Sequence, residues 1–155
     1  MAHSFLVEAG YWNVNGNWFK PNVTPIPLKG RIKIAWQRAN WFKLTTSLVC
    51  ADEAATEIIY QCRGNLNYEA KNYTYVSQHS LLGNIEGEGK LGDQSIIQYY
   101  WFIGTGSKQK GLDTFTCIDK NTYYLTSSIL DGHSIKNTIE AILTSDPAPR
   151  EGEAF

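Results

Sequence analysis

The sequence predicts an all-β protein, an antiparallel up-and-down meander of about 8–10 short strands closed into a barrel. Most of the chain consists of short segments in which apolar and polar residues alternate, which is the period of a half-buried strand. Glycine, proline, asparagine and aspartate separate these segments at short intervals. Within the stretch 94–104, nearly every position from Ile96 to Ile103 is apolar or aromatic and glycines flank the run, which indicates a strand covered on both faces. Closing such a meander removes its exposed edges.

The first half of the chain begins with residues 4–9, a short strand or a helical turn, and Asn15-Gly16 is a turn signal. Residues 21–27 contain three prolines and indicate a loop or an edge segment. The clearest alternating segments, each a predicted strand with one apolar face, are 31–38, 41–50, 56–66 and 73–80.

The second half continues with a strand over 83–91, in which Gly87 and Gly89 on the apolar face leave space for another group. A hairpin over 112–119 and 121–130 and a last strand over 133–144 follow, with Ile135 on the inner face of the latter. We predict one barrel domain over residues 1–145 and a disordered C-terminal tail over 146–155, which holds two prolines and alternating charge.

Composition limits the function classes. The 155 residues carry a formal net charge of −1 with both signs interspersed, which disfavours nucleic-acid binding. No apolar run approaches the roughly 20 residues of a membrane-spanning helix. The N-terminus lacks the features of a signal peptide and the three cysteines are an odd number, so we expect free thiols and a cytoplasmic location.

Histidine and cysteine offer limited chemistry. His79 or His133 could ligate a haem or a metal or act as a general base, but both also suit partly solvated strand ends. Cys50, Cys62 and Cys117 could bind metal or act as nucleophiles, but free cysteine is among the most buried residue types. We predict no metal site, and the sequence does not indicate which cofactor, if any, the protein binds.

Two further motifs have a simpler interpretation. Glu86 and Glu88 are spaced as a carboxylate pair for glycoside hydrolysis, but Lys90 continues the same row, as on a solvated outer face. Residues 104–108 follow an apolar strand as a phosphate-binding loop would, but they lack the Gly-Lys-Ser/Thr order and no helix follows.

Amphipathic aromatic side chains at alternate strand positions form the strongest candidate ligand site. They could line a cavity in which Arg63 or His79 fixes a carboxylate. The alternatives are that the aromatic rings fill the barrel, or that Tyr100 and Phe102 form a dimer surface. The predicted ligand-binding residues are Trp36, Tyr60, Arg63, Tyr75, His79, Tyr99, Trp101 and Tyr123.

The Gly-x-Trp sequence Gly10-Tyr11-Trp12, the chain length and a meander that closes on itself resemble the calycin superfamily. That group includes lipocalins, fatty-acid-binding proteins and the lipocalin-like bilin lyases. The resemblance spans residues 4–145 and implies an internal pocket. The Thr-Asp-Tyr signature of lipocalins has no counterpart in Asn121-Thr122-Tyr123-Tyr124, so the resemblance assigns no binding residues.

Three functions follow as hypotheses. The first is a calycin-like barrel that binds a small hydrophobic or aromatic molecule without a covalent bond. The second is an isomerase, cyclase or lyase acting at the barrel mouth, which requires at least two of His79, His133, Arg63 and Tyr75 to converge. The third is a non-catalytic homodimer that buries the apolar strand 94–104 in its interface.

Overall fold

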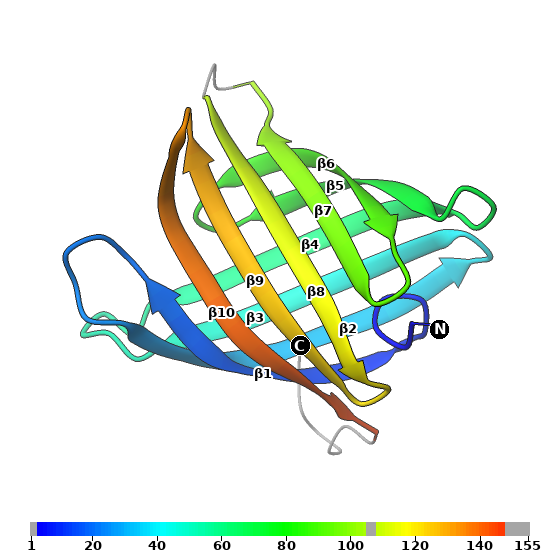
Figure 1. Cartoon of the computed structure of the whole chain (residues 1–155), viewed down its shortest axis with the longest axis horizontal. Coiled ribbons are helices and arrows are strands. Elements are labelled where there is room, and N and C mark those ends of the chain that lie inside the picture. The colour runs from blue at the N-terminus through cyan, green and yellow to red at the C-terminus, as the bar shows by residue number, and fades with distance from the viewer. Residues whose placement is uncertain (1–2, 105–107, 148–155) are drawn as a thin grey trace.

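The computed structural model describes residues 3–104 and 108–147 and confirms the predicted fold class (Figure 1). All neighbouring strands are antiparallel, and β10 returns to pair with β1, which closes the barrel. No helix in the described ranges is long and apolar enough to cross a membrane. The strands are β1 (Gly10–Phe19), β2 (Ile26–Arg38), β3 (Trp41–Cys50), β4 (Glu57–Asn67), β5 (Asn72–His79), β6 (Gly83–Leu91), β7 (Ser95–Phe102), β8 (Gln109–Asp119), β9 (Thr122–Asp131) and β10 (Ser134–Asp146).

The alternating segments form strands as predicted, and β3 and β6 have the predicted bounds. The turn expected at Asn15-Gly16 is wrong, because both residues lie inside β1. Gly16 is instead a site of close approach between strands. A Cβ atom there would lie 2.1 Å from the Glu140 carbonyl oxygen of β10. A glycine inside a strand often marks such an approach, and here it lets β1 and β10 pair closely where the barrel closes.

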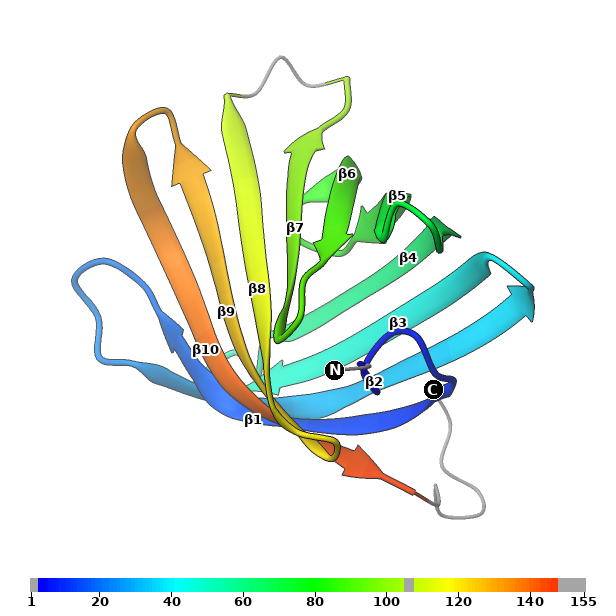
Figure 2. The same ribbon diagram turned by 45° about the vertical axis from the view of Figure 1, so that its right-hand side comes forward.

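The two ends of the barrel are covered differently (Figures 1 and 2). The turns β1–β2, β3–β4, β5–β6, β7–β8 and β9–β10 form one end, which we call the open end. The other four turns and the N-terminal residues 3–7 form the closed end. Barrel width grows with strand number, and about eight strands already enclose one small ligand. Ten strands therefore leave interior space that side chains must fill or a ligand can use.

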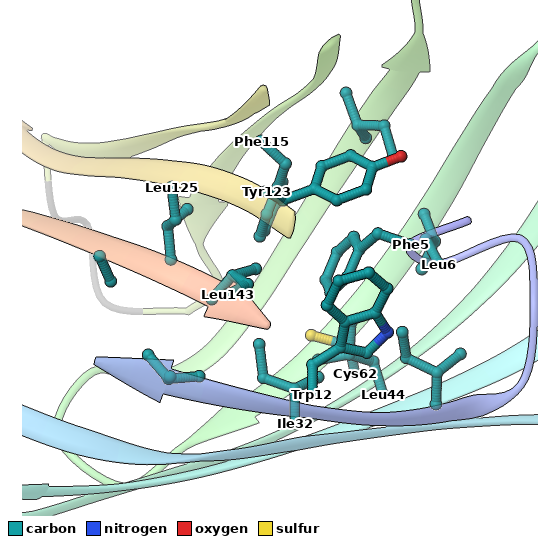
Figure 3. Close-up of a cluster of buried hydrophobic side chains, with 14 of the residues drawn as sticks. Phe5, Leu6, Trp12, Ile32, Leu44, Cys62, Phe115, Tyr123, Leu125 and Leu143 are labelled. Atoms are coloured by element: carbon teal, nitrogen blue, oxygen red, sulfur yellow. The ribbon is translucent and has the colours of Figure 1, made fainter. Parts of the chain in front are cut away.

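The N-terminal segment closes its end of the barrel with apolar side chains. Phe5 and Leu6 are 1% and 3% exposed, although neither lies in a strand. The Phe5 ring stacks on Phe115 at 4.8 Å between centroids and meets Trp12 edge-on at 5.4 Å (Figure 3). Tyr123 packs against the same ring at 5.5 Å. These contacts fill the core at the closed end of the barrel.

Hydrogen bonds fix the same segment to two turns. The two ring nitrogens of buried His3 lie 2.7 Å from the Tyr123 hydroxyl and 2.7 Å from the Gly92 carbonyl oxygen. The Ser4 hydroxyl donates to the Lys120 carbonyl oxygen at 2.6 Å. The Trp36 indole N–H donates to the Leu6 carbonyl oxygen at 3.1 Å. Residues 3–7 therefore form a plug that these hydrogen bonds hold in place.

The two faces of β7 are the reverse of those expected. Tyr100 is 6% exposed and faces the interior together with Phe102, whereas Tyr99 and Trp101 lie on the outer wall. In a strand, a shift of one residue exchanges the faces, and the stretch 96–103, which is apolar except for Gln98, carries too little alternation to fix the choice. The expectation that both faces are covered is also wrong, because Ile97 and Trp101 are 45% and 37% exposed.

The last strand shows one further difference. Ile135, expected inside, is 67% exposed, and a register shift between Ile135 and Asn137 accompanies this change of face. Beyond it, Ile139, Ala141 and Leu143 face the core as predicted. Asp146 is the last residue of β10, and residues 148–155 of the predicted tail lie outside the described residues.

Candidate functional site

A cavity of about 130 Å³ occupies the barrel interior towards the open end. Its rim includes Leu81 of the β5–β6 turn and Lys136 of β10, both exposed, so the cavity reaches solvent there. Much of its wall is apolar. The apolar lining residues are Val14, Trp18, Ile32, Leu48, Ile58, Leu81, Leu82, Ile85, Phe115, Leu125, Ile129 and Ile139. An engineered apolar cavity of about 150 Å³ is known to hold benzene, so this space can accept a ring of that size.

A chain of hydrogen bonds crosses one side of the cavity and centres on Asp113 of β8. The Gln98 side-chain N–H donates to one Asp113 carboxyl oxygen at 2.8 Å, and the Ser127 hydroxyl donates to the other at 2.5 Å. The Tyr73 hydroxyl donates to the Gln98 side-chain oxygen at 2.7 Å. Register explains the arrangement, because Gln98 on β7 and Ser127 on β9 both lie directly beside Asp113.

Three buried hydroxyls of the cavity wall, carried by β3 and β5, lack a partner. Among the described residues, Thr46, Tyr75 and Ser77 place side-chain oxygens in the interior with no hydrogen bond. Tyr60 and Cys62 lie near Thr46 and Ser77, but the contacts do not reach hydrogen-bond geometry. An unsatisfied buried hydroxyl costs about 1–3 kcal/mol, so the cavity contains groups that a ligand or water would satisfy.

Burial dominates the electrostatics of this wall. It raises the pKa of Asp113, and the hydrogen bonds from Gln98 and Ser127 offset only part of this rise. Burial also raises the pKa of the Cys62 thiol to about 12, so this thiol stays protonated and is no nucleophile at neutral pH. The pKa values of Tyr75 and Tyr100 rise for the same reason, with the Asp113 charge as the second cause.

Asp113→Asn should stabilise the ligand-free protein at pH 7. Because the folded pKa of Asp113 is raised, the folded state holds this proton at pH values where the unfolded chain has lost it. Its contribution to stability therefore falls as the pH rises from the unfolded value, about 3.9, through the folded pKa. Melting temperatures measured from pH 4 to pH 8 should show the variant above wild type at high pH, with the difference shrinking towards pH 4. A variant less stable than wild type at pH 7 would contradict this assignment.

His79 lines the cavity as a neutral imidazole. Its Nδ1 accepts the backbone N–H groups of Leu81 and Leu82 at 3.1 and 3.2 Å, which leaves the ring proton on Nε2. Burial lowers its pKa to about 4. The ring stacks on Tyr60 at 5.0 Å between centroids with an interplanar angle of 6°. His79 thus holds the β5–β6 turn over the cavity and offers it an uncharged surface.

His79→Asn should remove a pH dependence from folding. The unfolded histidine takes up a proton near pH 6.5, while the folded one resists until about pH 4. Stability present above pH 6.5 is therefore lost as the pH falls through this window, by at most about 3 kcal/mol. An asparagine oxygen can accept the same two N–H groups and does not titrate. Urea unfolding at pH 7 and pH 4.5 should show a smaller loss of unfolding free energy at the lower pH in the variant than in wild type. An equal loss in both proteins would refute the assignment.

The structure brings three of the eight predicted ligand-binding residues to the cavity: Tyr60, Tyr75 and His79. Trp36 and Tyr123 face inward at the closed end, where they bond to the N-terminal plug. Arg63, Tyr99 and Trp101 lie on the outer wall, so none of them reaches the interior. The arginine expected to fix a carboxylate is therefore absent from the cavity.

Four residues of the cavity, Asp113, Gln98, Ser127 and Thr46, were not predicted from the sequence. A signal for Asp113 was present, because it lies between Gly111 and Phe115 at alternate positions of one strand and is an acid on the inner face. The space expected at Gly87 and Gly89 is also occupied. Cβ atoms there would lie 2.5 and 2.0 Å from the rings of Tyr75 and Tyr73, so these glycines accommodate tyrosines rather than a ligand.

The remaining candidates lie apart from the cavity. His133 is exposed in the β9–β10 turn, so of the four residues expected to converge at the mouth only Tyr75 and His79 share the cavity. Glu86 and Glu88 are exposed on the outer wall as expected. Residues 105–107 of the glycine-rich loop lie outside the described residues. The three thiols are free.

No protein-family model and no curated protein matches this chain. Among solved structures, the chain is similar to Rv2717c from M. tuberculosis, with a TM-score of 0.69, 10% identity and coverage of 89% of this chain and 92% of that one. It is also similar to a de novo designed fluorescence-activating β-barrel (TM-score 0.52, 7% identity, 94% and 100% coverage). A redesigned barrel, mFAP1, bound to DFHBI, has a TM-score of 0.51, 10% identity and coverage of 92% and 99%. At these identities the likeness shows a shared barrel fold.

Proposed function

We propose that this protein binds a small, largely apolar or aromatic molecule with a hydrogen-bonding group in the cavity at the open end of the barrel. The observation that carries the proposal is the set of unpartnered hydroxyls of Thr46, Tyr75 and Ser77 on the wall of a largely apolar space. A ligand that satisfies them regains the free energy lost by burying them. The apolar wall supplies affinity, and the polar groups orient the molecule.

Two comparisons support this proposal. The fold is that of designed barrels, one of which holds the small molecule DFHBI. Internal binding is also what the calycin resemblance implies, and we propose that the chain shares that mode of binding. Unlike a fatty acid, the ligand we propose has no carboxylate, because the interior contains Asp113 where a carboxylate would need a cation.

Benzyl alcohol is a suitable first probe, because a benzene-sized ring carries one hydroxyl. At about 0.5 kcal/mol for each of its heavy atoms, a dissociation constant of about 1 mM is expected. Amide chemical shifts in a ¹H–¹⁵N spectrum should move for Thr46, Tyr75, Ser77 and their neighbours. Shifts confined to the outer wall, or no saturable shifts at tens of millimolar, would contradict the proposal.

A matched pair of variants on β5 locates the site. Ser77→Phe places a ring in the cavity and should abolish the shifts, because Ser77 is 4% exposed on the inner face. Val76→Phe, at an adjacent position 51% exposed on the outer wall, should leave the dissociation constant within about twofold. Equal binding by both variants would place the probe outside the barrel.

A further inference from the structure

The cavity contains one buried acid and no buried base. Among the described residues that line it, Asp113 is the only carboxylate, and the only lysine or arginine is Lys136, exposed at the rim. His79 is held neutral by burial and by the backbone N–H groups at its Nδ1. When ionised, Asp113 therefore gives the cavity a negative potential that no described lining residue inside the barrel neutralises.

The described side chains around Asp113 also lack a cation. Its hydrogen-bond donors, Gln98 and Ser127, are both neutral. The other titratable side chains affected by its charge come from β4, β5 and β7, and all are neutral acids: Tyr60, Cys62, Tyr73, Tyr75 and Tyr100. A buried charge without a partner is costly, and a buried charge that gains a hydrogen-bonded partner recovers much of that cost.

We propose that the ligand carries a protonated amine on a small aromatic or apolar body, with the ammonium group bound to Asp113 inside the cavity. This inference rests on the proposed function and names the chemical class of the ligand. A carboxylate has about four acceptor positions, and the donors from Gln98 and Ser127 occupy two of them. Positions remain for the N–H groups of a cation.

The rest of the cavity suits the same ligand class. An ammonium group has three donors, and the unpartnered oxygens of Thr46, Tyr75 and Ser77 are acceptors on the wall of the same cavity. The rings of Tyr60, Tyr75 and Tyr100 line the space, and the faces of such rings attract cations. An anionic ligand would meet Asp113 with no compensating charge in the interior.

Three probes with the same phenyl ring and similar size separate the ligand classes: benzylammonium, benzyl alcohol and benzoate. Their dissociation constants should be measured at pH 7.5 by amide shift titration with wild type and Asp113→Asn. In wild type we expect benzylammonium to bind at least tenfold more tightly than benzyl alcohol, and benzoate to bind most weakly. In the variant, benzylammonium should lose at least tenfold while benzyl alcohol changes by less than about twofold.

The outcomes distinguish this inference from the function on which it rests. If benzyl alcohol binds in the cavity of wild type as tightly as benzylammonium, the amine class is wrong while small-molecule binding stands. If benzoate binds most tightly, the inference is likewise overturned. If no probe moves the cavity resonances, both the inference and the proposed function fail. The wild-type comparison decides these cases even if Asp113→Asn does not fold.

Discussion

Gly30→Ala is expected to destabilise the barrel by about 3 kcal/mol or more. Gly30 lies in β2 opposite Leu48 of β3, and a Cβ atom at this position would lie 1.9 Å from the Ser47 carbonyl oxygen and 2.8 Å from the Leu48 Cα. Both contacts are with backbone atoms that the strand ladder holds in place. Relief would require β2 and β3 to separate, which would break hydrogen bonds on both sides of the substitution.

Gly10→Ala is the matched control, because Gly10 also lies in a strand and a Cβ atom there would meet nothing within 4 Å. Urea unfolding of both variants should place Gly10→Ala within about 0.5 kcal/mol of wild type. If Gly30→Ala unfolds at the same urea concentration as Gly10→Ala, the close pairing of β2 and β3 described above is incorrect.

Phe5→Ala is expected to cost about 3–5 kcal/mol, although Phe5 belongs to no strand. The ring is 1% exposed and packs on the rings of Trp12, Phe115 and Tyr123. Its removal leaves a void beneath three aromatic rings that the surrounding strands hold apart. The same change should loosen the closed end and speed amide exchange near Tyr123 and His3.

Phe19→Ala provides the comparison for the plug, because Phe19 ends β1 and is 38% exposed. Thermal unfolding should show a loss of less than about 1 kcal/mol for this control. A Phe5→Ala protein as stable as the Phe19→Ala protein would show that the N-terminal segment does not plug the barrel in solution.

The fold was predictable because most strands have one solvated face. In such a strand, the alternation of apolar and polar residues shows which side chains face the core. Thr46 lies between Leu44 and Leu48 in such a pattern, and β3 begins and ends where the pattern does. The closing pair of β1 with β10 was expected from the short connections, since an open meander would leave two edges unpaired.

The site was less predictable, because the sequence does not state which positions on different strands become neighbours. Asp113, Gln98 and Ser127 are separated by up to 29 residues and meet only through the register of β7, β8 and β9. The facing of β7 was undetermined because Tyr99, Tyr100, Trp101 and Phe102 are all aromatic. The plug carries no periodic signal, since Phe5 and Leu6 are adjacent and both buried.

A crystal structure of the protein soaked with 4-bromobenzyl alcohol tests the central claim most directly, because the anomalous signal of bromine marks the bound molecule. We predict a bromine peak inside the open end of the barrel, with the alcohol oxygen within hydrogen-bond distance of Thr46, Tyr75 or Ser77. An interior filled by protein side chains, or a peak found only on the outer wall near Arg63, would contradict the account.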